Sequence, residues 1–98
     1  MVAGEPAERI KNLDEIPSPY LTGLLDEFFD PTLIPLIQTN RGCPFACTFC
    51  VEGLNYYNKV NKKTVDMVYK ELCYIAERLR PSVHDLHITD SNFGMYKE

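Results

Sequence analysis

A helical repeat of apolar side chains across residues 64–79 is the feature that most constrains how this chain can fold. Placed at about 100° per residue, these side chains occupy a sector roughly 120° wide, which predicts a surface helix with one buried stripe. Thr64 suits the N-cap position, and Pro81 follows as a helix breaker. The predicted stripe comprises Val65, Val68, Tyr69, Leu72, Ile75, Ala76 and Leu79.

Two short apolar segments on either side of this helix predict β-strands. Residues 33–38 predict a buried strand that leads into a polar turn at 39–42, with Pro35 at its entrance or on a sheet edge. Residues 86–89 alternate apolar and polar side chains, which predicts a half-buried strand. The order strand, loop, helix, strand predicts an α/β fold built on one βαβ unit, with parallel strands and a right-handed crossover.

The size and charge of the chain limit it to one small folded unit and argue against several kinds of partner. A chain of 98 residues has room for one layered core, or for part of one. A net charge of −4 and a pI near 5.1 argue against a general nucleic-acid binder, which would be basic. No secretory signal and no apolar run of membrane-spanning length is present. We therefore expect a cytoplasmic protein with no nucleic-acid or membrane partner.

Three segments outside these elements predict solvated or irregular structure. Residues 1–32 form a leader and connector: residues 1–12 are polar and aperiodic, whereas 13–32 mix prolines and a glycine with apolar side chains. We expect the leader to be solvated and the connector to lie against apolar surface. A basic stretch just before the helix predicts a solvated turn, and it contains Lys59, Lys62 and Lys63.

The cysteines carry the chemical signal of this sequence. In a reducing cytoplasm, thiols are more often metal ligands or catalytic groups than disulfide partners. Cys43, Cys47 and Cys50 form a CxxxCxxC arrangement directly after the first predicted strand, where Gly42 and Pro44 bend the chain. Their sulfurs can therefore face one centre. The fourth cysteine, Cys73, lies at the rim of the helical stripe, which predicts a small packed thiol.

Three thiolates favour an iron-sulfur cluster over zinc. A structural zinc site takes four protein ligands, usually in two separated pairs. A cubane cluster held by three cysteines leaves one iron open to a small molecule. Two alternatives stay open: structural zinc completed by Cys73 or a histidine, and an electron-transfer cluster that binds no small molecule.

The CxxxCxxC loop after the first strand resembles the signature of the radical S-adenosylmethionine (radical SAM) superfamily. Residues 16–20, 24–26, 39–44 and 90–93 are also similar to the cobalamin-binding subgroup of that superfamily. The resemblance implies a partial (β/α) TIM-like barrel. Residues 33–98 would be the truncated start of this radical SAM core, and we expect this chain alone to be inactive.

The resemblance also implies a set of cofactors. Cys43, Cys47 and Cys50 would ligate a 4Fe-4S cluster, whose open iron would bind the amino and carboxylate groups of S-adenosylmethionine. An electron from the cluster would then cleave the sulfonium to give methionine and a 5'-deoxyadenosyl radical. A flavodoxin or ferredoxin would donate the electron, and any cobalamin would be bound by a domain absent from this chain. The substrate is not implied.

Four further residues are expected near S-adenosylmethionine through the same resemblance. Phe49 occupies the aromatic position between the last two cysteines, where the family commonly sets a ring close to the adenine. Asp90, Ser91 and Asn92 follow the second strand, where the family's loop approaches the amino group of the cofactor. The resemblance names no catalytic acid or base in this chain.

Overall fold

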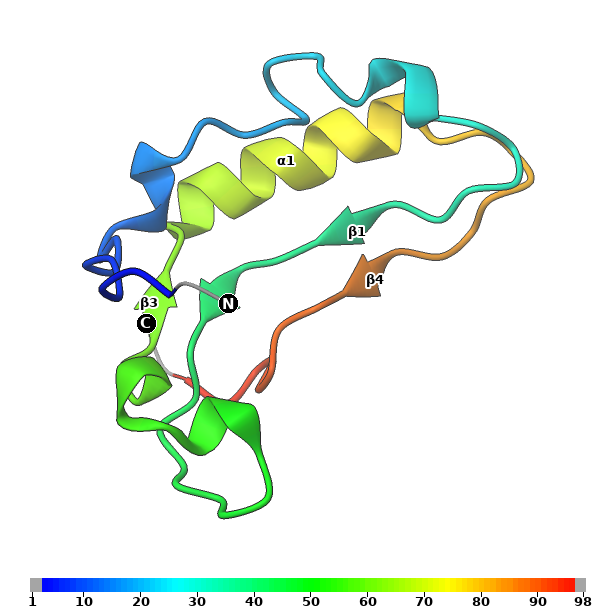
Figure 1. Ribbon diagram of the computed structural model, residues 1–98. Coiled ribbons are helices and arrows are strands. Elements are labelled where there is room, and N and C mark those ends of the chain that lie inside the picture. The colour runs from blue at the N-terminus through cyan, green and yellow to red at the C-terminus, as the bar shows by residue number, and fades with distance from the viewer. Residues whose placement is uncertain (1–2, 97–98) are drawn as a thin grey trace.

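The computed structural model describes residues 3–96, which form one α-helix, two small sheets and four turns of 3-10 helix (Figure 1). The helix is α1 (Val65–Arg78), and no helix among the described residues is long and apolar enough to cross a membrane. The strands are β1 (Leu36–Ile37), β2 (Asn40–Arg41), β3 (Asn61–Lys62) and β4 (His87–Ile88). The 3-10 turns are η1 (Leu13–Glu15), η2 (Asp26–Phe28), η3 (Val51–Gly53) and η4 (Asn55–Tyr57).

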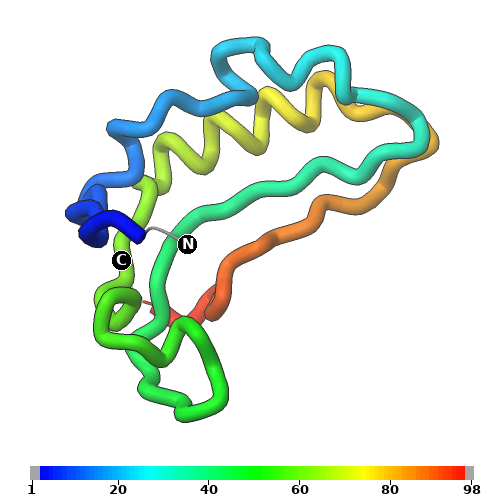
Figure 2. The backbone as a smooth tube through the Cα atoms, viewed as in Figure 1, coloured from blue at the N-terminus to red at the C-terminus, as the bar shows by residue number. Residues whose placement is uncertain are grey.

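Strands β1 and β4 pair in parallel, as the order of predicted elements requires. Leu36 lies opposite His87, and Ile37 lies opposite Ile88. The His87 amide donates to the Pro35 carbonyl at 3.0 Å, which extends the pairing beyond the strand ends. The two segments run side by side along most of the molecule in Figure 2. Both strands are shorter than the predicted ranges 33–38 and 86–89.

The prediction that residues 33–38 form a buried strand is wrong for most of the run. Ile37 is buried, whereas Leu33, Ile34 and Leu36 are each about half exposed. Successive strand side chains point to opposite faces, and α1 lies on only one side of the β1 and β4 pair (Figure 1). Ile37 therefore packs toward the core, and Leu36 faces away from it.

Helix α1 begins as the sequence predicts. Thr64 is the N-cap, and its hydroxyl oxygen accepts from the Met67 amide at 3.2 Å. The Thr64 amide and hydroxyl donate to the Asp14 carboxylate at 3.0 and 2.6 Å. These hydrogen bonds from Thr64 hold the pKa of Asp14 below its ordinary value. The cap thus joins the start of α1 to η1, fifty residues earlier in the chain.

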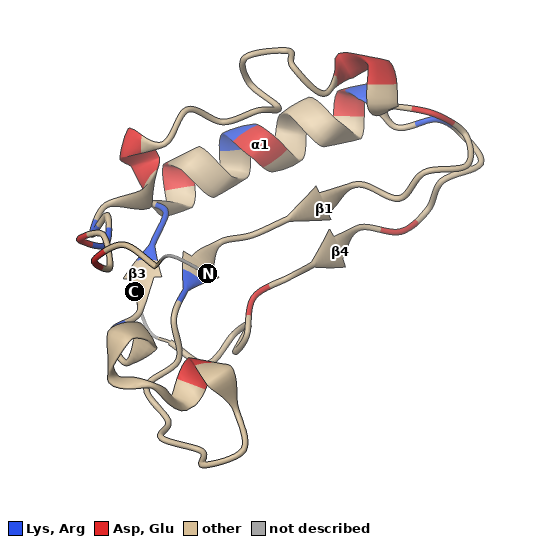
Figure 3. Ribbon diagram, in the orientation of Figure 1, with Lys and Arg blue, Asp and Glu red and all other residues tan. Residues whose placement is uncertain are grey.

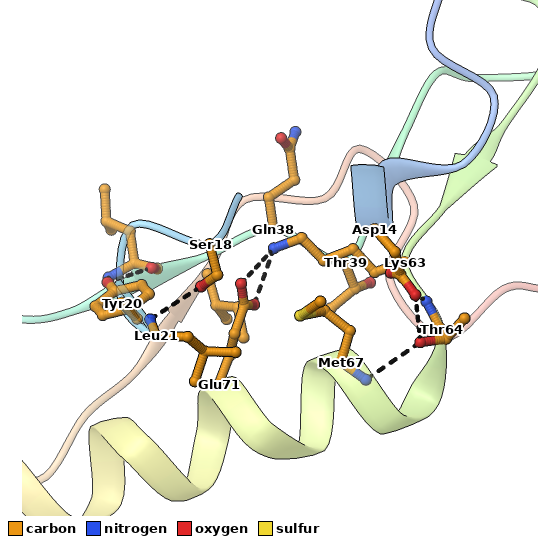
Figure 4. Close-up of polar contacts among 12 residues, drawn as sticks. Asp14, Ser18, Tyr20, Leu21, Gln38, Thr39, Lys63, Thr64, Met67 and Glu71 are labelled. Atoms are coloured by element: carbon orange, nitrogen blue, oxygen red, sulfur yellow. Dashed lines mark hydrogen bonds and ion pairs between the residues drawn. The ribbon is translucent and has the colours of Figure 1, made fainter. Parts of the chain in front are cut away.

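The buried face of α1 differs from the predicted apolar stripe. Ile75 is buried as predicted, but its buried neighbour one turn earlier is Glu71, which is 1% exposed. Val65, Tyr69 and Leu72 of the predicted stripe are exposed instead. Burial of Glu71 is possible because Lys63 donates to both carboxylate oxygens, at 2.9 and 2.8 Å (Figure 4). A hydrophobic periodicity cannot anticipate such a pair.

The connector, residues 13–32, follows α1 along its length (Figure 2). The connector contacts the start of α1 through Asp14. Near the end of α1, the Tyr74 hydroxyl donates to Asp26 at 2.5 Å. The buried Tyr20 donates its hydroxyl to the Leu36 carbonyl at 2.5 Å and accepts from the Leu36 amide. The connector therefore bridges α1 and β1, and the buried apolar side chains are Leu13, Tyr20, Ile37 and Ile75.

A second, antiparallel sheet replaces two predicted turns. Strands β2 and β3 pair with Asn40 opposite Lys62 and Arg41 opposite Asn61. The sequence predicts a turn at 39–42 and a solvated basic turn at 59–63, so both predictions are wrong where the strands form. Neither segment alternates apolar and polar side chains, so the sequence pattern does not indicate a strand at either place. This sheet carries the intervening loop that contains the three clustered cysteines.

Candidate functional site

Residues 42–60, called here the cysteine loop, project from β2 and β3 beyond the end of β1 (Figure 1). Cys43 is half-buried, Cys47 and Cys50 are exposed, and all three are free thiols. Within residues 3–96, no three His, Cys, Asp or Glu side chains gather as ligands of one metal ion. The donor set itself, three free thiols in one loop, has the chemistry that iron-sulfur clusters require. Ligation by these thiols stays a prediction.

Two glycines allow the cysteine loop to fold back on itself. Gly42 has a φ of +107°, and a Cβ there would lie 2.3 Å from the Lys59 carbonyl oxygen. The next amide, that of Cys43, donates to the Tyr57 carbonyl at 2.9 Å. A Cβ on Gly53 would likewise lie 2.3 Å from the Cys47 carbonyl oxygen. Only glycine permits these approaches: the one at Gly42 holds the two ends of the loop together, and the one at Gly53 packs the middle of the loop against Cys47.

Arg9 fastens the base of the cysteine loop, and it is the half-buried exception in a leader whose other described residues, 3–8 and 10–12, are exposed as predicted. Its guanidinium donates to the carbonyls of Tyr56 at 3.1 Å, Lys59 at 2.7 Å and Arg41 at 3.2 Å. The Tyr56 hydroxyl donates to the Ala7 carbonyl at 2.8 Å. The planar five-donor fork of arginine suits this task, because one side chain reaches both ends of the loop.

Replacing Arg9 with methionine is expected to loosen the cysteine loop without disturbing α1. Charge-assisted bonds to carbonyls are stronger than neutral ones, so hydrogen exchange of the Cys43 amide should accelerate roughly tenfold. Arg80→Met is the matched control, because Arg80 donates to the Phe29 carbonyl at 2.8 Å. Amide exchange followed by NMR measures both variants. An unchanged Cys43 exchange rate in Arg9→Met would contradict a fastening role.

The basic residues around the loop serve the fold. Figure 3 shows them on and beside β2 and β3, where the cysteine loop begins and ends. Lys63 turns inward to Glu71, and Arg41 donates to the Gln38 side chain at 2.8 Å. The Lys62 ammonium lies 5.9 Å from the centre of the Tyr96 ring. The predicted solvated basic turn is therefore largely engaged in contacts within the chain.

Asp90 joins the end of β4 to the start of the cysteine loop. One carboxylate oxygen accepts from the amides of Thr39 at 2.6 Å and Asn40 at 3.2 Å. The other accepts from the Asn40 side-chain amide at 3.0 Å and from the Thr39 hydroxyl. Asn40 itself is buried, which makes this a well-anchored junction. Contact of Asp90 with S-adenosylmethionine stays a prediction, and both of its oxygens have partners within the chain.

Asn92 reaches the cysteine loop directly. Its side-chain amide donates to the sulfur of Cys43 at 3.2 Å, so the structure brings together two of the residues singled out from the sequence. Burial raises the pKa of Tyr96, and the charge of a Cys43 thiolate would raise that pKa further.

Ser91 and Phe49 have exposed side chains. Ser91 lies in the turn after β4, and Phe49 is 92% exposed on the cysteine loop. Their contacts with S-adenosylmethionine stay predictions. Cys73 is half-buried on α1, beside Tyr69 one helical turn earlier, in keeping with the packed thiol that its place on the helix predicts.

Three residues have contacts that the sequence does not indicate. Arg9 is a single arginine in an aperiodic polar segment, and its partners lie 32 to 50 residues away. Lys63 and Glu71 are eight residues apart, and Lys63 lies before the N-cap of α1, so no helical spacing indicates that the two side chains meet. Only a three-dimensional arrangement identifies their roles.

Several curated proteins similar to this chain are methyltransferases. A 2-(S-pantetheinyl)-carbapenam-3-carboxylate methyltransferase of Streptantibioticus cattleyicolor is 36% identical, with 96% of this chain and 14% of that protein aligned. The cobalamin-dependent radical SAM methyltransferase TokK of Streptomyces tokunonensis is 35% identical with the same coverage. A tryptophan 2-C-methyltransferase of Streptomyces laurentii is 32% identical over 59 residues, which are 60% of this chain and 9% of that protein.

These relatives are much longer than this chain, which spans about 14% of the length of the first two. No protein-family profile matches the chain, and no solved structure matches it. The homology relates the chain to methyltransferase enzymes, and one of these homologues is a cobalamin-dependent radical SAM enzyme.

Proposed function

We propose that this chain forms the cluster-binding part of a cobalamin-dependent radical SAM methyltransferase. One observation carries the proposal: this chain has a CxxxCxxC loop of free thiols, and 96% of the chain aligns with a cobalamin-dependent radical SAM methyltransferase. The other methyltransferase relatives support the reaction class.

The residues of this chain would bind and orient the cofactors. Cys43, Cys47 and Cys50 would hold a 4Fe-4S cluster by three irons and leave the fourth for S-adenosylmethionine. A cluster bound by these thiols would supply the electron for reductive cleavage of S-adenosylmethionine, and a cobalamin bound outside this chain would take part in methyl transfer. Phe49 would contribute its exposed ring to the adenine, and residues 90–92 would flank the amino group.

The proposed fold context is a partial (β/α) barrel in which β1 and β4 are neighbouring strands. Support comes from their parallel pairing and from the position of the cysteine loop beyond the carboxyl end of β1. Active sites of such barrels lie at the carboxyl ends of the strands, where the βα loops emerge. We propose a cytoplasmic location and a flavodoxin or ferredoxin as electron donor.

Anaerobic reconstitution with iron and sulfide tests the proposal. The expected product is brown and contains about four irons and four sulfides per chain. Adding S-adenosylmethionine is expected to change the electron paramagnetic resonance spectrum of the reduced cluster, because the cofactor binds the open iron. A colourless protein that retains zinc would overturn the proposal in favour of a structural zinc site. A cluster whose spectrum ignores S-adenosylmethionine would favour a simple electron carrier.

A further inference from the structure

We infer that Asn92 is a positioning residue that raises the reduction potential of the cluster by donating an amide N–H to the sulfur of Cys43. The inference rests on the proposed function, because it requires a cluster on the cysteine loop. It assigns Asn92 a role in electron transfer that is separate from any contact with S-adenosylmethionine.

The contact lies at the junction of two parts of the chain 49 residues apart. The Asn92 amide nitrogen is 3.2 Å from the Cys43 sulfur, and both side chains are partly buried. Cys47 and Cys50 are exposed, so water competes for their sulfurs. Of the three candidate ligands, Cys43 is the one that is partly shielded from water, and its sulfur accepts a hydrogen bond from Asn92.

Both partners of this hydrogen bond are held in place by other contacts. Asp90, two residues before Asn92, accepts from Thr39 and Asn40 at the entrance of the cysteine loop. On the other side, the Cys43 amide donates to Tyr57 at 2.9 Å. The donor is thus oriented toward the sulfur before any cluster binds. Preorganised dipoles need no rearrangement when charge arrives, which is the condition under which they act most strongly.

The electrostatic effect of the amide has a definite sign. Reduction adds one electron to the cluster and increases the negative charge on its sulfurs. An N–H dipole directed at a ligand sulfur stabilises the reduced form more than the oxidised form, so the potential rises. Asn92 would therefore ease electron transfer from the donor protein to the cluster.

Redox titration of the reconstituted cluster in two variants tests this role. Asn92→Leu removes the donor and keeps a similar volume, and Asn92→Asp keeps the shape but adds negative charge. The expected order of midpoint potentials is wild type, then Asn92→Leu, then Asn92→Asp as the lowest. At a fixed applied potential, the reduced-to-oxidised ratio should fall about tenfold in Asn92→Asp, which corresponds to about 59 mV for one electron.

Asn58 provides the matched control, because it lies in the same loop with an exposed side chain. Asn58→Leu and Asn58→Asp make the same chemical changes, but water screens a charge at that position. Their midpoint potentials are expected to equal that of the wild type. The isosteric Asp variant provides the decisive measurement even where the Leu variant assembles no cluster.

The two proposals fail in different ways. If the wild-type protein assembles a cluster but the Asn92 variants titrate at the same potential as the wild type, the inference about Asn92 is overturned and the proposed function stands. If both Asn58 variants shift as much as the Asn92 variants, the effect is not specific to the Cys43 contact, and the inference is also overturned. If the wild-type protein assembles no cluster, the proposed function falls and the inference falls with it.

Discussion

Alanine at Cys43, Cys47 or Cys50 is expected to abolish assembly of a stable cluster, whereas alanine at Cys73 is expected to leave it intact. A cubane already anchored by only three thiolates loses a third of its protein ligands with each substitution. Cys73 is half-buried on α1 beside Tyr69, and the cysteine loop lies beyond the end of β1. Bound iron, acid-labile sulfide and visible absorption after anaerobic reconstitution measure the effect in each variant.

Because Cys47 and Cys50 are exposed, loss of the cluster in their variants can be separated from loss of folding. Cys47 and Cys50 are on the surface of the loop, so their substitution should leave the folded structure unchanged, as far-ultraviolet circular dichroism would verify. Full iron content in Cys47→Ala would show that the loop does not ligate the cluster. Loss of metal in Cys73→Ala would identify a fourth protein ligand and leave no open iron for S-adenosylmethionine.

The parts of the fold that were predictable from the sequence depend on local regularities. The extent of α1 follows from its 3.6-residue period, from Thr64 as its cap and from Pro81 beyond its end. The parallel pairing of β1 and β4 follows from the order strand, helix, strand, since a helical crossover returns the chain in the same direction. These signals lie within one element or between consecutive elements.

The rest of the fold depends on contacts that no local pattern encodes. The buried face of α1 includes Glu71 because Lys63, on the segment after β3, neutralises it. Leu36 is exposed because only one side of β1 is covered by α1. The described part of the polar leader, residues 3–12, is exposed as predicted apart from Arg9, and no local pattern indicates that the Arg9 guanidinium donates to three carbonyls at the base of the cysteine loop.

The candidate site also has features that the sequence indicates and features that it does not. The three cysteines could be identified from their spacing alone, because ligand spacing within one loop is a local property. The contact between Asn92 and Cys43 could not be identified, because it requires β4 to pair with β1 and Asp90 to fasten the following turn. The sequence places the cysteines after the first predicted strand and Asn92 after the second, and the structure adds which of their atoms face each other.

Replacing Lys63 with methionine is expected to destabilise the fold by about 3–5 kcal/mol, because it leaves the Glu71 carboxylate buried without its partner. The side chains of Lys63 and Glu71 are 18% and 1% exposed, and the ammonium donates to both carboxylate oxygens (Figure 4). Methionine keeps the apolar stem of lysine, so the loss reflects charge rather than packing. Urea unfolding followed by circular dichroism measures the free energy of unfolding.

Two further variants test whether the unpaired Glu71 carboxylate causes the loss of stability in Lys63→Met. The double variant Lys63→Met with Glu71→Met should regain most of the lost stability, since matched apolar side chains can replace a buried ion pair at little cost. Lys70→Met disrupts the exposed pair with Asp66 on the same helix and should change stability little. If Lys63→Met and the wild type have equal free energies of unfolding, burial of the Glu71 carboxylate does not depend on Lys63.

The ion pair also links α1 to the cysteine loop. The Lys63 amide donates to the Thr39 carbonyl at 2.9 Å, and the side chain of Thr39 donates to Asp90. A stabilising contact at Lys63 therefore fixes the chain at the exit of the loop, while Asp90 fixes it at the entrance. We expect Lys63→Met to lower global stability and also to accelerate hydrogen exchange of the backbone amide at position 63. Loss of the side-chain bonds to Glu71 would loosen the backbone that donates to the Thr39 carbonyl.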